Sequence, residues 1–165
     1  MRNTVLLVAA MSVGACTTAN STDHPNTVTT AINYIEFSET THRAELSEYL
    51  DVDPVRTEWC AAFVNSVLEE SGITSNNDHK YPLTARAFLD WGYMVLPDEI
   101  KSGDVVVFPR GKQGWQGHVG FYVQTSYFNG EEYYAILGGN QSNKVSIEWY
   151  PARKALGIRR DHPPF

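Results

Sequence analysis

The chain has 165 residues, of which 42% are hydrophobic and 12% are aromatic, so it is long and apolar enough to bury one core. That composition excludes disorder of the whole chain. The formal net charge of -6 at pH 7, without any run of Lys or Arg, argues against a surface that binds nucleic acid or anionic membranes. The sequence therefore predicts a single folded domain whose partner is neutral or cationic.

The N-terminus has the pattern of an export signal. Arg2 precedes an apolar run over 5–13 that is too short to remain as a membrane-spanning helix, and small residues lead from it to Cys16. We expect a signal peptide over 1–15 and a polar tether over 16–26, because the latter stretch has no apolar period. The folded domain then covers 27–165.

The sequence VGAC, which ends at Cys16, resembles the cleavage box of bacterial lipoproteins, in which the cysteine becomes the first residue and is acylated. This resemblance implies a membrane anchor through the N-terminal lipid. Because Thr17 follows the cysteine, it also implies an outer-membrane lipoprotein that faces the periplasm. The alternative is an ordinary signal cut near Ala15, which also exports the protein. In both cases Cys60 has no partner within the chain, which indicates a reactive thiol or an intermolecular disulfide.

Apolar spacing predicts helices in the first half of the domain. The pattern indicates a helix near 31–37, a short one over 43–50, a central one over 58–70 and another over 84–91. Thr57 is a suitable N-cap for the central helix, which would make Cys60 its third residue. Gly72 is placed to end that helix with a positive φ.

After Gly103 the apolar spacing changes to the period of a strand. Strands are expected over 104–108, 118–124, 132–137 and 144–149, with a short last strand near 157–159. The turns between them have the sequences GKQGWQG, NGEE and GGNQSN. Helices followed by successive strands indicate an α+β fold, with N-terminal helices packed on an antiparallel sheet of five to six strands.

Cys60 is the first candidate for a catalytic residue. In the first turn of a helix, unpaired amides and the helix dipole favour an anion and lower the pKa of a thiol. Glu58 would oppose this effect if its carboxylate lay close. The alternative is that Cys60 is a small buried residue of an apolar helix.

His118 and Asn140 are the residues best placed to assist such a thiol. In GHVGFYV, alternation places Val119 on the core face and His118 on the opposite face, where two glycines leave room for a neighbouring element or a substrate. Asn140 follows the next strand, so its amide oxygen can accept the Nδ1 hydrogen of the imidazole and orient the ring. The alternatives are a histidine on a solvated face and an asparagine that forms a turn. Cys, His and Asn together form a known nucleophilic triad.

Five motifs, in their order along the chain, resemble those of the CHAP and NlpC-type cell-wall hydrolases of the papain-like superfamily: WCAAFVN, GDVVVF, GHVGFYV, LGGNQSNKVSIEWYP and LGIRR. The resemblance implies a papain-like fold and cleavage of an amide bond in peptidoglycan, within the stem peptide or between the sugar and L-alanine. It also implies Cys60 as nucleophile, His118 as general base and Asn140 as the orienting residue. The acyl transfer that follows needs no metal or organic cofactor.

Aromatic side chains near these residues are candidates for substrate binding, namely Trp115, Tyr122 and Trp91. The alternative is that they cover the edges of the core. Two carboxylates at Asp51 and Asp53 are too few for a calcium site without other oxygen ligands. Zinc held by Cys60 and His118 would lack further ligands.

Two other functions remain open at this point. One is a catalytically silent lipoprotein that keeps the fold and binds peptidoglycan. The other is a lysis factor or antibacterial effector, which would share the chemistry of the hydrolase. The reactivity of the Cys60 thiol separates the first alternative from the hydrolase, whereas the sequence is silent on the second.

Overall fold

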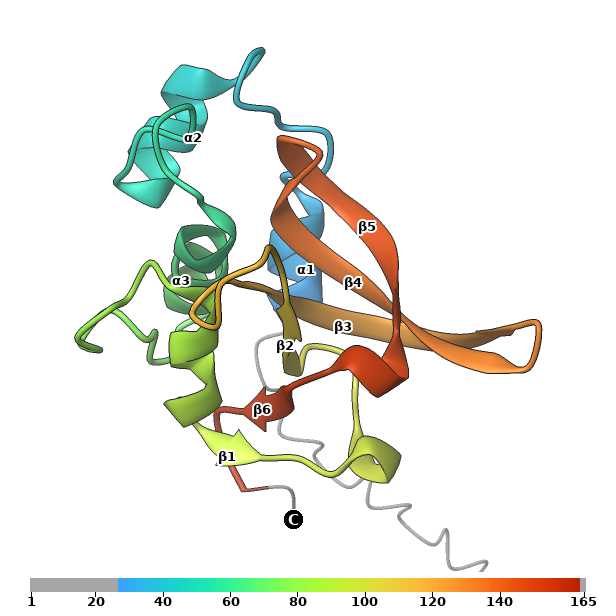
Figure 1. Ribbon diagram of the computed structural model, residues 1–165. Helices are drawn as coiled ribbons and strands as arrows, with labels where there is room; N and C mark the ends of the chain where they lie inside the picture. The colour runs from blue at the N-terminus through green and yellow to red at the C-terminus, as the bar shows by residue number, and fades with distance from the viewer. Residues whose placement is uncertain (1–26, 164–165) are drawn as a thin grey trace, which may run out of the picture.

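The computed structural model describes residues 27–163, with the α-helices of its first half along one side of a curled sheet (Figure 1). The predicted signal peptide over 1–15, the tether over 16–26 and the acylation site at Cys16 lie outside the described residues. Among residues 27–163, no helix is long and apolar enough to span a membrane.

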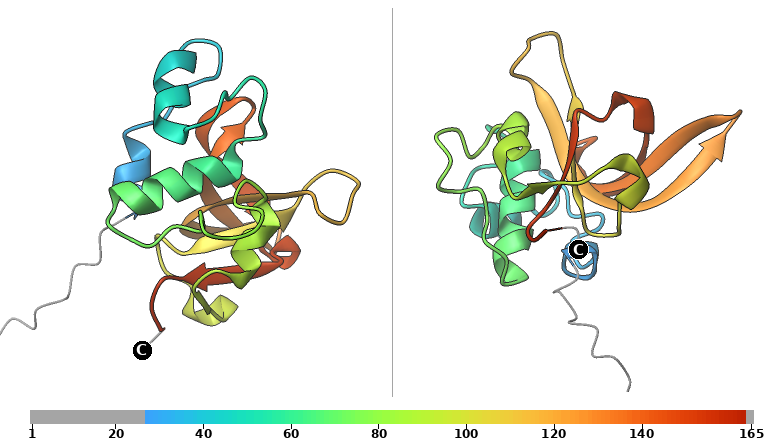
Figure 2. Two further views of the ribbon diagram at one scale, coloured as in Figure 1. Left: turned by 90° about the vertical axis from the view of Figure 1, so that its left-hand side faces the viewer. Right: turned by 90° about the horizontal axis from the view of Figure 1, so that it is seen from below.

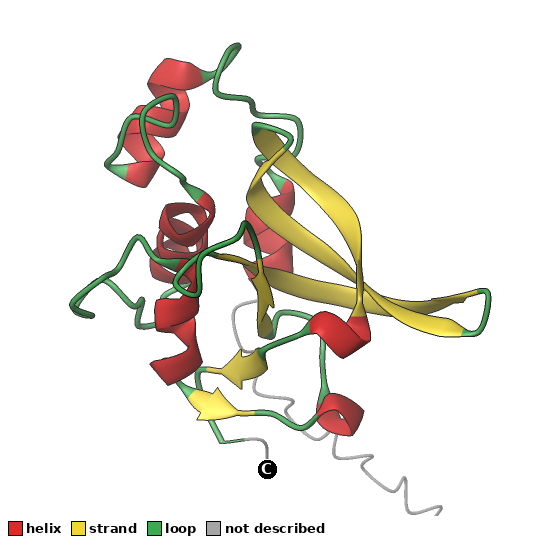
Figure 3. Cartoon of the chain, in the orientation of Figure 1, coloured by secondary structure: helices red, strands yellow, loops and turns green. Residues whose placement is uncertain are grey.

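The first half of the domain is helical and the second half is rich in strands (Figure 3). The α-helices are α1 (Thr27–Ile32), α2 (Arg43–Leu50) and α3 (Cys60–Glu70). Three short 3₁₀-helices are η1 (Ala85–Asp90), η2 (Pro97–Glu99) and η3 (Ala152–Lys154). The predicted helix over 43–50 is confirmed, and the helix predicted over 84–91 is the 3₁₀-helix η1.

The central helix begins later than its sequence suggests. Cys60 is its first residue, and the N-cap is Trp59, which makes no side-chain capping bond. The expectation of an N-cap at Thr57 was therefore wrong. The indole of Trp59 is fully buried and packs edge-on against Phe63, so burial rather than a capping hydroxyl fixes the start of the helix. Gly72 ends the helix with a φ of 73°, as predicted.

The second half forms a six-stranded antiparallel sheet, which confirms the predicted α+β class. Its strands are β1 (Tyr93–Met94), β2 (Val105–Pro109), β3 (Gly117–Phe128), β4 (Glu131–Gln141), β5 (Lys144–Pro151) and β6 (Gly157–Arg160), in the spatial order β1-β6-β2-β3-β4-β5. The strand β1 was not predicted, because its two residues are both exposed and carry no apolar alternation. The five predicted strands are confirmed, and β3 and β4 are longer than expected.

Both faces of the sheet are apolar at its centre. Helices α1 and α3 pack against β3 and β4 on the first face, where Val119 and Phe121 join the main core. The other face carries a second cluster that includes Tyr122 and Ile136, against which the segments around η2 and η3 pack. Figure 2 shows these segments on the side of the sheet away from α3. Residues on the second face of β3 are therefore buried and not solvated.

The GGNQ sequence lies within β4, although it was predicted as a turn. The register of β4 against β5 shifts between Gly138 and Gln141, which marks a β-bulge. A Cβ at Gly139 would lie 2.6 Å from Cζ3 of Trp59, so glycine is needed here for the close approach of α3 to the sheet. The chain turns directly after Gln141, at Ser142 and Asn143, both with positive φ.

A buried ion pair joins the last strand to the start of β2. Arg160 donates from Nε and from Nη2 to the two carboxylate oxygens of Asp104, each at 2.7 Å. Nη2 also donates to the carbonyl of Glu99 at 3.0 Å. Because either charge would be costly to bury alone, the pair fixes the end of β6 on the sheet.

Candidate active site

Cys60 is a free cysteine with only 3% of its surface exposed. Burial raises the pKa of its thiol, while the positive charge of Arg110 and hydrogen bonds from the amides of Val119 and Ala61 lower it. Burial is the largest of these effects, so the expectation of a lowered thiol pKa was wrong for the resting site. The position at the helix start is confirmed, but a helix start this deeply buried favours the neutral thiol.

His118 lies on β3, where it pairs with Phe108 of β2. Its side chain is 1% exposed and stacks on the ring of Tyr150 with the centroids 5.4 Å apart. Burial, together with the positive charge of Arg110, lowers the pKa of this imidazole to about 4. The imidazole is therefore neutral at neutral pH.

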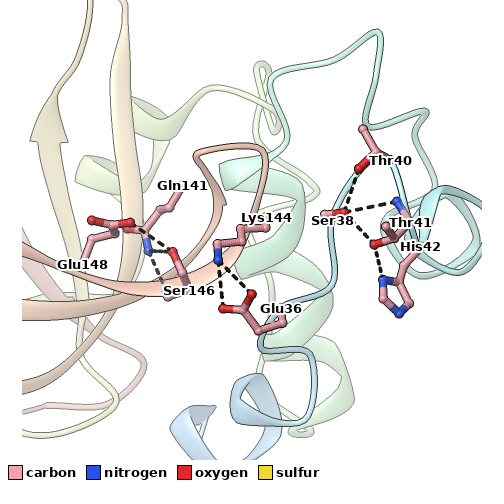
Figure 4. Close-up of polar contacts among 9 residues, drawn as sticks. All are labelled: Glu36, Ser38, Thr40, Thr41, His42, Gln141, Lys144, Ser146 and Glu148. Carbon is pink, nitrogen blue, oxygen red and sulfur yellow. Dashed lines mark hydrogen bonds and ion pairs between the residues drawn. The ribbon is translucent and has the colours of Figure 1, made fainter.

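Gln141 is the hydrogen-bond partner of His118, with 2.9 Å between the imidazole Nε2 and the amide Oε1. The amide nitrogen of Gln141 donates to the carbonyl of Ser146 at 2.6 Å (Figure 4). It also donates to the carbonyl of Ile136 at 3.3 Å. Since carbonyls accept only, the amide oxygen must face the imidazole, and Nε2 of His118 carries the hydrogen. Nδ1 then keeps its lone pair, and it is buried without a hydrogen-bond partner.

Asn140 makes no hydrogen bond to Nδ1 of His118, so the predicted orienting bond is corrected. Its side chain donates to Oε2 of Glu58 at 2.7 Å, and its carbonyl accepts from Nη2 of Arg110 at 2.8 Å. Strict alternation from Ile136 would put residue 140 on the same face as His118. The bulge between Gly138 and Gln141 adds one residue, so Gln141 takes that face instead.

Three shared neighbours bring the thiol and the imidazole into one site. The amide of Val119, which follows His118 in the chain, donates to the thiol. The charge of Arg110 acts on both groups. Tyr150 stacks on the imidazole, and the negative charge of Cys60 contributes to raising the pKa of Tyr150 to about 12.

Cys60 opens onto a cavity of about 290 Å³. Trp115 lines this cavity and is 67% exposed, and its role in substrate binding stays a prediction. The other lining residues are Glu58, Leu83, Thr84, Ala85, Arg110, Gly111, Gln116, Gly117, Asn140 and Asn143. A larger cavity of about 570 Å³, between η2, η3 and the second core cluster, contains none of the predicted site residues.

Two residues predicted to bind substrate lie elsewhere. Tyr122 is buried in the second core cluster, and its hydroxyl bonds to that of Thr125 at 2.8 Å. Trp91 is also buried, and its indole nitrogen donates to the carbonyl of Thr74 at 2.9 Å. Tyr122 is a core residue because the second face of the sheet is covered, which alternation along one strand does not reveal. Trp91, at the end of η1, is buried because it packs on Phe88 in the main core.

Sequence reasoning missed Gln141, Tyr150 and Arg110. Gln141 was passed over because the GGNQ sequence was interpreted as a turn, in which strand parity has no meaning. Arg110 directly follows the strand that pairs with His118, and that adjacency is the only sequence signal for it. Within residues 27–163 there is no cluster of three or more His, Cys, Asp or Glu side chains that could hold a metal ion.

Comparison with known proteins finds a match among solved structures. No family model and no curated protein matches this sequence. Among solved structures, the chain is similar to an NlpC/P60 family protein from Bacillus cereus. The two have a TM-score of 0.40 and 19% identity, and the likeness covers 63% of this chain and 32% of the other. This chain thus spans about a third of the length of that NlpC/P60 protein.

Proposed function

We propose that this protein is a cysteine amidohydrolase that cleaves an amide bond of peptidoglycan, within the stem peptide or between the sugar and L-alanine. The observation that carries the proposal is that a buried thiol shares the neighbours Arg110 and Tyr150 with an imidazole whose Nδ1 is buried without a hydrogen-bond partner. The export signal and the five motifs of the sequence favour the cell wall as the source of the substrate.

In the proposed reaction, Cys60 is the nucleophile and His118 is the general base. Nδ1 accepts the thiol proton as the sulfur attacks the carbonyl carbon, and the same nitrogen then gives the proton to the leaving amine. Water hydrolyses the resulting thioester with the imidazole again as base. Gln141 takes the orienting role, because its fixed amide oxygen sets the tautomer of the imidazole.

The negative charge of the tetrahedral intermediate needs donors near the sulfur. The first amides of α3 have no partners within the helix, and the amide of Cys60 is one of them. It is therefore the natural first donor to the oxyanion. The cavity beside Cys60 has a polar rim and the indole of Trp115, a combination that suits a peptide next to a sugar.

The proposed place of action follows from the N-terminal sequence. We propose an outer-membrane lipoprotein that faces the periplasm, with acyl chains on Cys16 and peptidoglycan as its partner. Incorporation of labelled palmitate into the wild type and not into Cys16→Ser tests the anchor. Label in both proteins, or in neither, would contradict it.

The decisive experiment is mass spectrometry of the muropeptides released from purified peptidoglycan by residues 17–165, with Cys60→Ala as the control. We expect new termini at one type of amide bond with the wild type alone. Identical product profiles from the two proteins, across walls of several chemical types, would refute the hydrolase.

A silent peptidoglycan-binding protein is the second candidate, and the raised pKa of the deeply buried thiol favours it. For that function, both the wild type and Cys60→Ala would sediment with insoluble peptidoglycan, and neither would release muropeptides. The same pair of proteins therefore decides between the two functions.

A further inference from the structure

Arg110 is a cation held in place at the mouth of the cavity that Cys60 lines. Its Nη2 donates to the carbonyl of Asn140 at 2.8 Å. Its Nη1 lies 4.0 Å from Oε2 of Glu58 and, although buried, has no hydrogen-bond acceptor. The side chain is 40% exposed, whereas that of Glu58 is 83% exposed. One end of the guanidinium is thus anchored to β4, and the other is left without a bonded partner.

The charged and titratable groups around Cys60 come from every neighbouring element. Glu58 precedes α3, and Arg110 follows β2. His118 of β3 is neutral above about pH 4, and Tyr150 of β5 is neutral below about pH 12. From η1, Arg86 is turned to the carbonyl of Gln116 at 2.7 Å, while β4 supplies only the neutral amides of Asn140 and Gln141.

At neutral pH the charge that acts on the sulfur therefore comes from two residues. Arg110 favours the thiolate and Glu58 opposes it. The charge of Arg110 also disfavours a proton on His118, so an imidazolium is disfavoured from the same side. A resting pair of thiolate and imidazolium would have to form beside a third charge that repels one of its members.

We propose that Arg110, held by Asn140 at the cavity that Cys60 lines, is a positioning residue that supplies the positive charge for the sulfur anion as it forms, from a resting state in which Cys60 is a neutral thiol and His118 a neutral imidazole. Asn140 holds the guanidinium in place and Glu58 sets how strongly it acts. The inference rests on the proposed function in taking Cys60 as the nucleophile.

The proton then moves only during the reaction. As the bond from sulfur to carbon forms, the thiol proton passes to Nδ1 of His118, and the π electrons of the carbonyl move to its oxygen. When the bond from carbon to nitrogen breaks, the same proton passes to the leaving amine. Arg110 offsets the negative charge that develops at Cys60 during attack, and it takes no proton itself.

The test is the pH dependence of alkylation of Cys60 by iodoacetamide in the purified mature protein, with Cys60→Ala as the blank. We expect the wild-type rate to rise through a single ionisation, with no plateau on the acid side. Arg110→Gln should move the midpoint up by about one pH unit and slow alkylation about tenfold below it. Glu58→Gln should move the midpoint down and speed alkylation about twofold, because the exposed carboxylate is well screened.

Two further variants complete the comparison. Arg110→Lys keeps the charge and should recover most of the rate, and Arg56→Gln removes an exposed arginine elsewhere and should leave the profile unchanged. The proposal is overturned if Arg110→Gln, shown to be folded by circular dichroism, has the wild-type profile. It is also overturned if the wild type keeps a plateau of reactivity down to about pH 5, as a resting ion pair would.

Alkylation needs no peptidoglycan, so the two proposals fail separately. If the pH profile of alkylation depends on Arg110 but no muropeptides are released, the hydrolase is refuted, whereas the effect of Arg110 on the Cys60 sulfur stands. If the wild type hydrolyses peptidoglycan but Arg110→Gln leaves the pH profile of alkylation unchanged, only the inference about Arg110 is refuted.

Discussion

Lowering the pH should destabilise the fold through His118. Its imidazole has a pKa of about 4 in the folded protein, against 6.5 in an unfolded chain. Between these values the unfolded state binds the proton and the folded state does not. The free energy of unfolding therefore falls as the pH drops through 6.5. Above about pH 7.5 the imidazole is neutral in both states, so His118 causes no loss of stability there.

The size of the effect follows from the shift and its cause. One pKa unit corresponds to about 1.4 kcal/mol, so the loss from this residue should reach about 2 kcal/mol at pH 5 and about 3 kcal/mol at pH 4. The imidazole is almost completely buried, so solvent screening reduces these values little. A domain of this size has a stability of about 5–15 kcal/mol, so the loss is a substantial part of the total.

The assay is urea unfolding of the wild type and of His118→Gln, followed by tryptophan fluorescence from pH 8 to pH 4. Glutamine is neutral and can donate to Gln141, while all other titrating groups are common to both proteins. The difference in unfolding free energy between the wild type and the variant therefore reports on His118 alone. From pH 8 to pH 4 this difference should decrease by about 3 kcal/mol. Parallel pH profiles of the two proteins would refute a buried, neutral His118.

Three further predictions test the site and its support. Gln141→Ala should slow muropeptide release at least about 100-fold, because the imidazole of His118 loses its fixed tautomer. Asn140→Ala should slow release less than about tenfold. Equal losses in the two variants would contradict the assignment of the orienting role to Gln141. Gly139→Ala should lower the free energy of unfolding, measured in urea, by about 2 kcal/mol or more, because the new Cβ would lie 2.6 Å from the indole of Trp59. An unchanged unfolding midpoint would contradict the close approach of helix and sheet. Asp104→Asn should lower the free energy of unfolding by about 3 kcal/mol in the same assay, because it leaves the charge of Arg160 buried without its partner. A decrease below about 1 kcal/mol would show that the ion pair is open to solvent.

Local patterns were sufficient for most of the secondary structure. The helix over 43–50 and the five longer strands follow from apolar spacing, because that spacing directly reflects which side of an element is buried. Gly72 ends α3 as predicted, because a positive φ favours glycine whatever packs around it. The start of α3 was misplaced, since a buried tryptophan, and not a capping hydroxyl, determines it.

The third member of the site depended on tertiary structure. The sequence placed Cys60 at a helix start and His118 on a strand, and both positions are confirmed. Whether Asn140 or Gln141 faces the imidazole depends on one extra residue in β4. That bulge forms where Trp59, the N-cap of α3, fills the space beside Gly139, a contact between residues that are far apart in the chain.

The sequence by itself determined α2, the five longer strands, and the placing of Cys60 at a helix start and of His118 on a strand, because these depend on neighbours in the chain. Only the tertiary structure decided that Tyr122 and Trp91 belong to the core, since both faces of the sheet are covered. It also decided the protonation of the site. Burial and the charge of Arg110 both act through space: burial outweighs the helix start and the charge of Arg110 at the thiol and keeps it neutral, whereas burial and Arg110 act together to leave the imidazole neutral.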